Sequence, residues 1–340
     1  MKILQVIDRL EAGGAERLLI SITHLLADKD VSSGVLLFND GGALDKELDP
    51  RVEVHLLNRT NKFNLFTLYK AHRICKQYDI VHAHLRHVYA YIRMAQLLFG
   101  GKYKLLLHDH AAITNDVPVR MRRIFKPRYY IGVNEEQTNW AIKTIGVEQQ
   151  NVFLLQNTVL AKELSSNLRP GSKKVILIAN IRQVKNIEFA ISLCRSMGWQ
   201  LDIYGNIIEQ EYYDRLKELA GDDNGINIIT GVTDFSSLYR QYNLAIHCSP
   251  KETGPLVLIE YLAVGLPFIA YQTGSAADII AAELPQLFMQ NFEPEQWQQR
   301  ITEIIQNEDL PRQMQQLFKM NFNPEDYINK CLQIYQSVHS

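Results

Sequence analysis

One strand–loop–helix–strand stretch, residues 244–271, constrains the fold of this chain more than any other. Residues 244–248 and 268–271 are short apolar runs typical of buried strands. Between them, a loop with Gly254 leads into an apolar helical run that ends at Gly265, a residue type that commonly stops helices. A strand, a tight loop, a helix and a second strand form one unit of a parallel sheet, so the stretch predicts an α/β fold.

The loop of this unit predicts a phosphate site. A helix that starts after Gly254 and Pro255 offers free backbone N–H groups and a partial positive charge, and both suit a phosphate. Glu252 stands at the mouth of the loop, and Glu260 lies about two helical turns further on, on a similar face. A ligand long enough to reach a phosphate site and both carboxylates is a nucleotide sugar.

The same alternation of strands and helices runs along the rest of the chain. Strand-like runs recur from residues 2–7 to 152–155, and after a polar linker at 165–174 the alternation restarts and continues into a helical tail. Residues 235–242 are predicted to be one of the helices of this second half. The pattern predicts doubly wound parallel sheets, and 340 residues with 46% hydrophobic content supply enough material for two cores.

Composition excludes several classes of protein. The net charge of −1 gives no bulk attraction to nucleic acid. The four cysteines lack the spacing of a zinc site or of a disulfide framework, which favours a reduced, cytoplasmic setting. No run approaches the length of a membrane span, and the chain begins directly with a strand, so no signal peptide is expected.

The spacing of two glutamates resembles a motif of a known enzyme family. Glu252 and Glu260, with seven residues between them and Gly-x-Pro following, resemble the motif of retaining glycosyltransferases of family GT4, which have the GT-B fold. Other motifs fall in that family's order and cover most of the chain: Gly13 to Arg17, Asp79 to His84, Arg182 to Lys185, Tyr204-Gly205 and Thr273-Gly274. Each motif alone is weak, whereas the ordered set is specific.

The resemblance implies an α/β protein with two Rossmann-like domains facing each other across a cleft. Residues 1–165 would form the N-terminal, acceptor-binding domain, and residues 172–323 the C-terminal domain that binds the nucleotide sugar. In the GT-B fold the last helix crosses back to the first domain. Residues 324–340 are the candidate for that helix.

The resemblance also assigns roles around the donor. Glu252 would contact the sugar hydroxyls or lie near the anomeric carbon, and Glu260 would bind both ribose hydroxyls. The backbone N–H groups of Leu256 and Val257 would face the diphosphate. Further donor-binding residues are expected in the glycine motifs and the loop, namely Gly13, Gly14, Gly205, Gly254 and Pro255. Of these, the Gly14 amide would face the diphosphate from the first domain.

Arg182 and Lys185 follow a strand end, where ligands bind in open α/β sheets. In GT-B enzymes, as the resemblance implies, such a pair neutralises the departing nucleoside diphosphate in place of Mg²⁺. Arginine can bind a phosphate bidentately, and lysine acts as a point charge. We therefore expect neither a metal nor a cofactor. The triplet Asp28-Lys29-Asp30 is interpreted as a solvated turn rather than a metal-binding motif.

Histidines end two strands of the first half. His108 and His110 resemble the family position at which a histidine meets the transferred sugar. His110 fits the family pattern better, and His108 is the alternative. His82 and His84 are interpreted as structural residues that cap or hydrogen-bond a loop.

A few positions depart from the family pattern. Thr253 stands where glycine is usual, and Asn180 where glycine is common. Gln183 replaces a proline, and Ser275 and Asp278 stand where glycine and glutamate are frequent. These departures bear on how the donor is held more than on the fold.

A basic cluster follows in the first half. Five cations in nine residues alternate with apolar groups, namely Arg120, Arg122, Arg123, Lys126 and Arg128. One interpretation is a solvated helix face. The other is a patch that brings the enzyme to an anionic membrane surface carrying lipid-linked acceptors.

The resemblance implies a glycosyltransferase of the hexosyltransferase type (EC 2.4). It would move a sugar, with retention, from a UDP- or GDP-sugar to a hydroxyl of a glycan or a polyprenyl-linked acceptor in polysaccharide assembly. The expected location is the cytoplasm, with peripheral attachment to the inner face of the cell membrane. Two alternatives stay open: another GT-B enzyme, such as a sugar-nucleotide epimerase or a phosphorylase, and a non-catalytic GT-B subunit, which Thr253 and the altered glycine positions favour.

Overall fold

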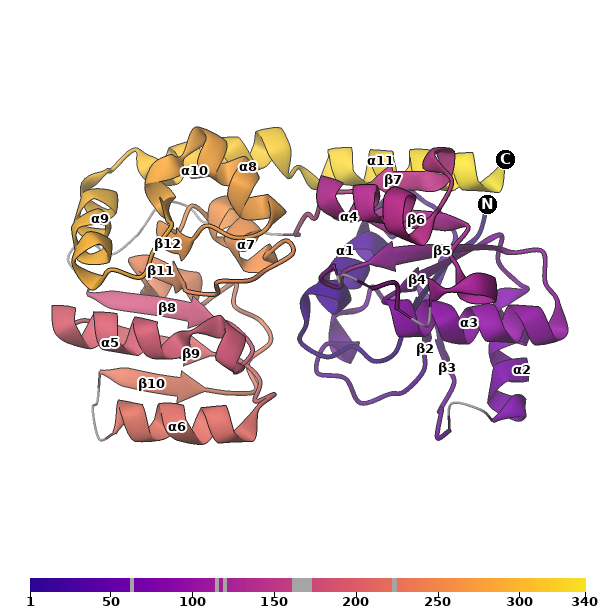
Figure 1. Ribbon diagram of the computed structural model, residues 1–340, viewed down its shortest axis with the longest axis horizontal. Coiled ribbons are helices and arrows are strands. Elements are labelled where there is room, and N and C mark those ends of the chain that lie inside the picture. The colour runs from indigo at the N-terminus through magenta and orange to yellow at the C-terminus, as the bar shows by residue number, and fades with distance from the viewer. Residues whose placement is uncertain (62–63, 114–115, 119–120, 161–172, 222–224) are drawn as a thin grey trace. The chain divides into compact units, whose positions relative to one another are not determined.

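The computed structural model describes the chain in two compact units (Figure 1). The residues it describes are 1–340 except 62–63, 114–115, 119–120, 161–172 and 222–224. Unit 1 consists of Met1–Thr158 together with Pro324–Ser340, and unit 2 consists of Val159–Asn323. Most of the polar linker expected at 165–174 lies outside the described residues.

Unit 1 is built on a seven-stranded parallel sheet in the order β3-β2-β1-β4-β5-β6-β7 (Figure 1). Its strands are β1 (Ile3–Ile7), β2 (Ser33–Leu37), β3 (Glu53–Leu56), β4 (Ile80–His84), β5 (Lys104–Asp109), β6 (Tyr129–Gly132) and β7 (Val152–Leu154). Its α-helices are α1 (Gly14–Asp28), α2 (Leu65–Cys75), α3 (Arg86–Phe99), α4 (Glu135–Trp140) and α11 (Pro324–His339). The C-terminal helix α11 thus belongs to the same unit as the N-terminus and packs against α1 and β4.

The two faces of the central strands of unit 1 differ in chemistry. Leu4, Val81 and Leu107 point to one face, where α2 and α3 complete an apolar core. Because side chains alternate along a strand, Gln5 and its register partner His82 point to the opposite face. Helices α1 and α11 lie over that face, and both polar side chains are fully buried. Unit 1 therefore contains a buried polar layer under its C-terminal helix.

Unit 2 is built on a six-stranded parallel sheet in the order β10-β9-β8-β11-β12-β13 (Figure 1). Its strands are β8 (Lys174–Ile178), β9 (Gln200–Tyr204), β10 (Ile226–Ile229), β11 (Leu244–His247), β12 (Phe268–Tyr271) and β13 (Phe288–Met289). Its helices are α5 (Ile187–Met197), α6 (Gln210–Ala220), α7 (Leu256–Val264), α8 (Ser275–Glu283), α9 (Pro294–Gln306) and α10 (Leu310–Asn321). Helix α7 between β11 and β12 is the parallel unit that the sequence predicted.

The strand order reverses once near the centre of each sheet. The reversal lies between β1 and β4 in unit 1 and between β8 and β11 in unit 2. At such a switch point the loops that follow the two strands lead to opposite sides of the sheet and leave a crevice at the carboxyl ends. In unit 2 these two loops carry Lys185 and Glu252, so the topology positions the predicted site.

One predicted helix is wrong. Residues 235–242 contain only a short 3₁₀ turn, Tyr239–Gln241, and no α-helix. The Asp234 carboxylate accepts the backbone N–H of Ser236 at 2.8 Å, a local turn that competes with helix formation. The elements α4, α8 and β13 were not predicted, because short segments give too little periodicity to recognise.

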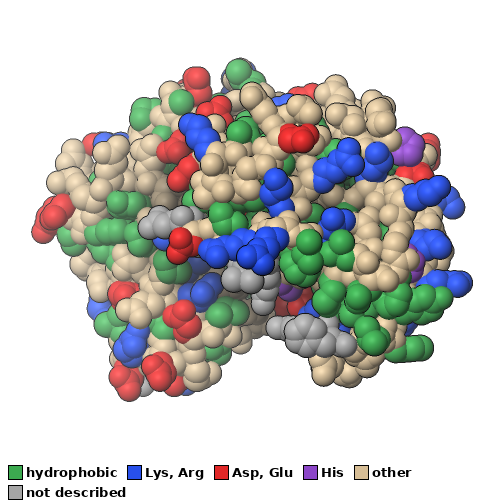
Figure 2. Space-filling view, turned by 45° about the vertical axis from the view of Figure 1, so that its right-hand side comes forward, with side chains coloured by type: hydrophobic (Ala, Val, Ile, Leu, Met, Phe, Trp, Pro, Cys, Tyr) green, Lys and Arg blue, Asp and Glu red, His purple; other side chains and the backbone are tan. Residues whose placement is uncertain are grey.

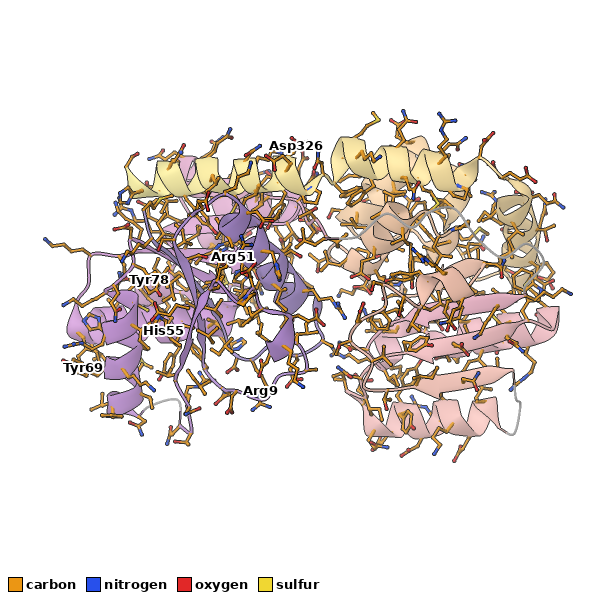
Figure 3. All side chains as sticks on the ribbon, turned by 180° about the vertical axis from the view of Figure 1, so that it is seen from behind. Arg9, Arg51, His55, Tyr69, Tyr78 and Asp326 are labelled. Carbon is orange, nitrogen blue, oxygen red and sulfur yellow. The ribbon has the colours of Figure 1, made fainter. Side chains whose placement is uncertain are left out.

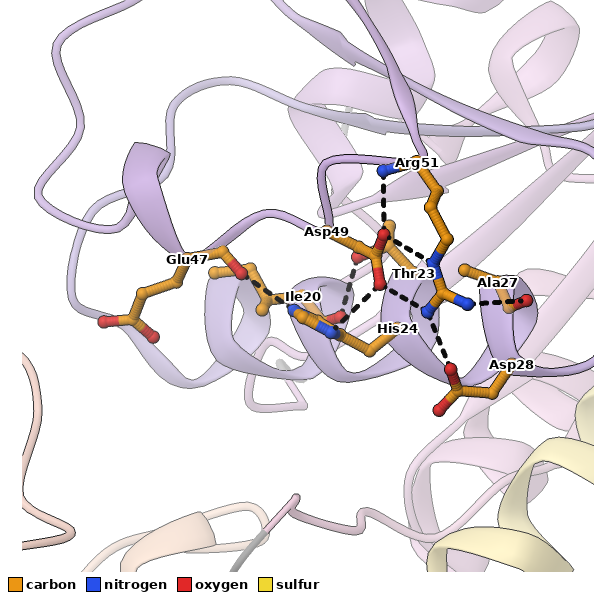
Figure 4. Close-up of polar contacts among 8 residues, drawn as sticks. All are labelled: Ile20, Thr23, His24, Ala27, Asp28, Glu47, Asp49 and Arg51. Atoms are coloured by element: carbon orange, nitrogen blue, oxygen red, sulfur yellow. Dashed lines mark hydrogen bonds and ion pairs between the residues drawn. The ribbon is translucent and has the colours of Figure 1, made fainter.

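The Asp28-Lys29-Asp30 turn is tied into unit 1 by ion pairs, and Figure 4 shows the one between Asp28 and Arg51. Arg51 donates to the Asp28 carboxylate at 2.6 Å and to the buried Asp49 carboxylate at 2.6 Å. Lys29 forms an ion pair with Glu325 at the start of α11. The turn is a surface feature, as expected, and its first two side chains have protein partners.

Candidate active site

The loops after β8 and β11 bring Lys185 and Glu252 together in unit 2. Lys185 ends the 3₁₀ turn Gln183–Lys185, and its ammonium forms an ion pair with the Glu252 carboxylate. The Ser249 hydroxyl donates to the Val184 carbonyl at 3.2 Å and joins the same two loops a second time. Two residues predicted to act on one ligand from different strand ends are therefore in direct contact.

His247, the last residue of β11, completes this group and was missed by sequence reasoning. Its imidazole is buried, and Nε2 lies 3.6 Å from Glu252 Oε1. Burial opposes the charge on Glu252, but His247 and Lys185 outweigh that effect and lower the pKa of Glu252 to about 2. The carboxylate is therefore ionised at neutral pH and accepts hydrogen bonds only. The sequence signal that could have identified His247 is its place as a polar residue at the end of an otherwise apolar strand.

Arg182 lies at the end of β8 and faces a different acid. Its Nε is 3.5 Å from Oε1 of Glu209, and the second oxygen of Glu209 accepts the backbone N–H of Gln183 at 2.8 Å. The side chains of Arg182 and Glu209 are 51% and 42% exposed. Exposed ion pairs contribute little stability, so an anionic ligand can take Glu209's place at Arg182. Glu209 was not among the predicted site residues.

Helix α7 begins at Leu256, directly after the site loop. Pro255 is its N-cap and provides no side-chain capping bond. The Leu258 N–H donates to the Pro255 carbonyl at 3.3 Å. The N–H groups of Leu256 and Val257, which precede it, have no partner within the helix. They are aligned with the positive end of the helix dipole, an arrangement that suits a phosphate.

The loop that carries Glu252 is fixed in place by the residues after β12. The Glu252 N–H donates to the Thr273 hydroxyl at 3.1 Å, and the Ser275 N–H donates to the Thr253 carbonyl at 3.1 Å. Gly274 has a φ of 81°, and a Cβ there would lie 3.1 Å from the Glu252 carbonyl oxygen. Only glycine fits this turn without strain. Thr253 and Ser275, two departures from the family pattern, are part of this bracing.

Glu260 lies on α7 and is held by a tyrosine that sequence reasoning did not single out. The Tyr239 hydroxyl donates to Glu260 Oε2 at 2.7 Å. Tyr239 itself is buried and packs edge-on against Tyr261, with ring centroids 6.0 Å apart. The Glu260 carboxylate is half-buried, so a ligand hydroxyl can reach it.

Gly205 follows β9 and has a packing role. A Cβ at this position would lie 1.9 Å from the Ala179 carbonyl oxygen. The chain leaving β9 therefore passes against the backbone at the end of β8 more closely than any side chain would allow. This contact accounts for glycine at Gly205 without a ligand.

In unit 1, Gly13 and Gly14 form the start of α1. Gly13 is the N-cap, Gly14 is the first helical residue, and no side chain caps the helix. A Cβ on Gly13 would lie 2.3 Å from Glu16 Oε2. Burial raises the pKa of Glu16 to about 7. The glycine loop thus combines an uncapped helix N-terminus with a carboxyl group that is partly protonated at neutral pH.

The two candidate histidines of unit 1 differ in exposure. His108 is fully buried, whereas His110 is partly exposed. Burial lowers the pKa of His110 to about 4, so the imidazole is neutral at neutral pH. Between them, Asp109 accepts from Arg86 at 2.8 Å and from Tyr130 at 2.9 Å, which fixes the end of β5. His110 is the histidine that a ligand can reach.

Two models of glycosyltransferase families match the chain one after the other. The model "Glycosyltransferase Family 4" matches residues 12–159, and "Glycosyl transferases group 1" matches residues 161–318. The chain belongs to this family of glycosyltransferases. It is therefore an enzyme that transfers a sugar from a nucleotide sugar.

Solved structures confirm the GT-B fold of this glycosyltransferase. HepE of Anabaena, solved in complex with UDP and glucose, is 18% identical, with a TM-score of 0.83 over 99% of this chain and 100% of that one. Sucrose-phosphate synthase of Thermosynechococcus elongatus is 15% identical, with a TM-score of 0.77 over 99% and 98%. An uncharacterized glycosyltransferase of Haemophilus influenzae is 22% identical over 76% of this chain and 77% of its own length.

The basic cluster of the glycosyltransferase lies on unit 1. Arg120 lies outside the described residues, and Arg122, Arg123, Lys126 and Arg128 are exposed. The segment forms a 3₁₀ turn, Arg123–Phe125, so its interpretation as a helix face is wrong. Ile124 is 60% exposed. The Arg93 side chain of α3 donates to the Ile124 carbonyl at 3.0 Å and holds the turn against that helix.

Helices α2 and α3 add an apolar surface that was not predicted. Their large exposed apolar residues are Leu65, Phe66, Tyr69, Leu97, Leu98 and Phe99. Tyr69 and Phe99 pack edge-on with ring centroids 5.3 Å apart, and Figure 3 shows Tyr69 on the outer side of α2. Figure 2 shows a face on which Lys and Arg side chains lie next to exposed hydrophobic ones. None of the helices in the described residues is long and apolar enough to span a bilayer.

Proposed function

We propose that this glycosyltransferase moves a sugar, with retention of configuration, from a nucleoside diphosphate sugar to a hydroxyl of a glycan or lipid-linked acceptor. The single observation that carries the proposal is the contact of Lys185 with Glu252 beside the uncapped start of α7. It combines a cation, free N–H groups and an ionised carboxylate at the switch point of unit 2, where a diphosphate and a sugar would both be recognised.

In this proposal the diphosphate binds between the cations and the helix. Lys185 and Arg182 now face Glu252 and Glu209. A diphosphate would partly replace these two carboxylates as the negative charge beside Lys185 and Arg182. It would also accept hydrogen bonds from the backbone N–H groups of Leu256 and Val257. As the bond to the sugar breaks, negative charge grows on the leaving phosphate, and preorganised donors stabilise it. Lys185 and Arg182 would thus do the work that other enzymes give to a divalent cation.

The sugar would lie against Glu252. Because the pKa of Glu252 is about 2, the carboxylate is an acceptor for sugar hydroxyls and not a proton donor. The acceptor proton therefore needs another base, and we propose the donor's own phosphate oxygen in a front-face displacement. Glu260 would accept hydrogen bonds from both ribose hydroxyls. These would replace the hydrogen bond of 2.7 Å that the Tyr239 hydroxyl donates to Glu260.

Unit 1 would supply the acceptor side and a second contact to the sugar. The neutral, partly exposed His110 is proposed to hydrogen-bond the transferred sugar, with His108 as the alternative. The Gly14 amide at the uncapped start of α1 is proposed to face the diphosphate, with Gly13 leaving room for the approach. Closure over the donor would exclude water and limit hydrolysis.

The donor base and the acceptor are the least constrained parts of the proposal. Uridine is the first base to test, because HepE was solved with UDP-glucose, and guanosine is the second. The exposed cations and Ile124 next to α3 support a lipid-linked acceptor reached from the cytoplasmic face of the membrane, in polysaccharide assembly. Binding of the surface would be peripheral.

A donor screen tests the proposal. Nucleotide sugars are added singly, and the melting temperature is measured, because a ligand that binds only the native state raises it. A uridine or guanosine diphosphate sugar is expected to raise it, and Lys185→Ala is expected to lose most of the shift. Product analysis with the donor alone then separates transfer from epimerisation. The proposal fails if no nucleotide sugar binds, or if the bound sugar is isomerised without an acceptor.

A further inference from the structure

Four histidines, three of them fully buried, form a cluster in unit 1 on the polar face beneath α11. His84 of β4 is the register partner of His108 of β5, and His82 and His110 lie two residues from them on the same face. Ring centroids are 4.5 Å apart for His82 and His84, 5.4 Å for His84 and His108, and 4.2 Å for His108 and His110. His82, His84 and His108 are fully buried.

Several ring nitrogens in this cluster have no hydrogen-bond partner. They are Nε2 of His82 and both nitrogens of His108. Buried polar atoms in folded proteins are nearly always paired, and leaving one unpaired costs about 1–3 kcal/mol. Three such atoms lie in this one cluster, and none of the described side chains supplies their hydrogen bonds.

The residues around the cluster orient its lone pairs inward. Gln5 Oε1 accepts a hydrogen bond from the N–H at Nε2 of His84 at 2.8 Å, so Nδ1 of His84 carries the lone pair. Gln5 Nε2 donates to the Tyr335 hydroxyl at 2.9 Å. The same hydroxyl lies 2.7 Å from His82 Nδ1, and in the tautomer in which it accepts from that nitrogen, the lone pair of His82 is on Nε2.

This arrangement resembles the outer contacts of histidine metal sites. Histidine ligands in metalloproteins usually donate their second ring N–H to a neighbouring acceptor, which fixes the tautomer and the ring orientation. Gln5 plays that part for His84, and the Tyr335 hydroxyl is in position to play it for His82.

We propose that His82, His84, His108 and His110 bind one divalent transition-metal ion of the zinc class. One nitrogen of each of the first three lies within 4.8 Å of the others. Nε2 of His110 forms a hydrogen bond of 3.3 Å with Nδ1 of His84, and this separation also fits two nitrogens that are each about 2.0–2.1 Å from one tetrahedral ion. Imidazole nitrogens favour Zn²⁺, Cu²⁺, Ni²⁺ and iron over Mg²⁺ or Ca²⁺.

The ion would have a positioning role in unit 1. It would bind β4 to β5 beneath α11 and hold His110 through Nε2, which leaves Nδ1 of His110 for the sugar contact of the proposed function. The site is separate from the cations of unit 2, so the expectation that diphosphate neutralisation needs no metal is unaffected. The metal proposal itself does not depend on the reaction that the enzyme catalyses.

Metal binding to the full chain tests the proposal. Tag-free protein is treated with a chelator, dialysed, and titrated with Zn²⁺ by calorimetry. One ion per chain is expected, and Co²⁺ should give the visible absorption of a tetrahedral nitrogen-ligated ion. His82→Gln and His108→Gln should each abolish this binding. Gln5→Met, which removes an outer contact, should weaken it by about 10–100-fold.

His72→Gln is the matched control. His72 is also a buried histidine of unit 1 with an unpartnered Nδ1, but it packs against Tyr69, Phe99 and Tyr103 outside the cluster. It should bind Zn²⁺ like the wild type. Circular dichroism and the melting temperature show which variants are folded. The proposal is overturned if the wild type takes up no ion, or if folded His108→Gln binds it as tightly as His72→Gln does.

Discussion

Lys185 and Glu252 form an ion pair that joins the loop after β8 to the loop after β11. Both side chains are largely buried, at 19% and 16% exposure, and His247 lies behind the carboxylate. The pair therefore lies at the carboxyl ends of β8 and β11, the position proposed for the diphosphate and the sugar. Replacing Lys185 and replacing Glu252 are therefore expected to have different effects on nucleotide binding and on turnover.

Replacing Glu252 should affect turnover more than nucleotide affinity. Glu252→Gln keeps the shape of the side chain but removes the charge that sugar hydroxyls would use, and a charge-assisted hydrogen bond is worth about 1.5–3 kcal/mol. We expect kcat to fall by roughly 10–100-fold, while free nucleoside diphosphate binds at least as tightly, because Lys185 is released. Calorimetry and steady-state kinetics measure the two effects. Weaker diphosphate binding with unchanged kcat would contradict the assigned role.

Replacing Glu260 should affect nucleotide affinity more than turnover. Glu260→Ala removes the proposed acceptor for both ribose hydroxyls, so nucleoside diphosphate binding should weaken by roughly 10–100-fold. Tyr239→Phe is the control, because it removes the hydroxyl that donates to Glu260 at 2.7 Å and leaves the carboxylate in place. Its effect on affinity should be small. Wild-type affinity in Glu260→Ala would rule out the ribose contact.

Transfer should persist in excess chelator. Arg182 and Lys185 are proposed to neutralise the leaving diphosphate, so no Mg²⁺ or Mn²⁺ is required at that step. Activity is measured with and without chelator, then after addition of Mg²⁺, Mn²⁺ or Zn²⁺. Complete loss that Mg²⁺ or Mn²⁺ restores would refute the role of the two cations. Loss that only Zn²⁺ restores would instead point to the histidine cluster of unit 1.

The basic cluster should bind anionic membranes in a salt-dependent way. Each cation near an anionic surface contributes about 1 kcal/mol, so Arg122→Glu/Arg123→Glu/Lys126→Glu should weaken vesicle binding by roughly 100-fold or more. Sedimentation with anionic vesicles at low and high salt measures this, because salt shortens the Debye length. The control is Arg215→Glu/Lys217→Glu/Arg312→Glu, an equal charge change on unit 2. Equal sedimentation of both variants would leave the cluster as a solvated surface.

Asp49 should make unit 1 sensitive to acid (Figure 4). Hydrogen bonds from the Arg51 side chain and backbone lower the pKa of the buried Asp49 carboxyl. Its stabilisation is therefore present above the ordinary carboxyl pKa of about 3.9 and is lost as the pH falls below that value. Asp49→Asn should lower the melting temperature by roughly 2–4 °C at neutral pH and flatten its decline in acid.

Asp28→Asn is the control for this experiment. Asp28 also accepts from Arg51, but its side chain is 64% exposed, so its loss should change the melting temperature little. A decline in acid that is unchanged in Asp49→Asn would show that other carboxylates dominate it.

The α/β class, the alternation of elements and the family could be read from the sequence alone. Apolar runs separated by amphipathic helices leave few alternatives to parallel sheets, because each strand must be buried on both faces. The stop at Gly265 and the strand at residues 268–271 followed from local preferences. The helix predicted at residues 235–242 was wrong, because the side chain of Asp234 forms a local hydrogen bond that competes with helix formation.

The tertiary structure decided which side chains meet. Lys185 and Glu252 come from loops far apart in sequence, and the strand order that makes β8 and β11 neighbours is what pairs them. His247 joins them for the same reason. In unit 1, α11 brings Tyr335 to His82 across 253 positions of the chain and buries the histidine cluster. Periodicity reports only the local environment of each element, so contacts set by strand order and helix return exist only once the chain has folded.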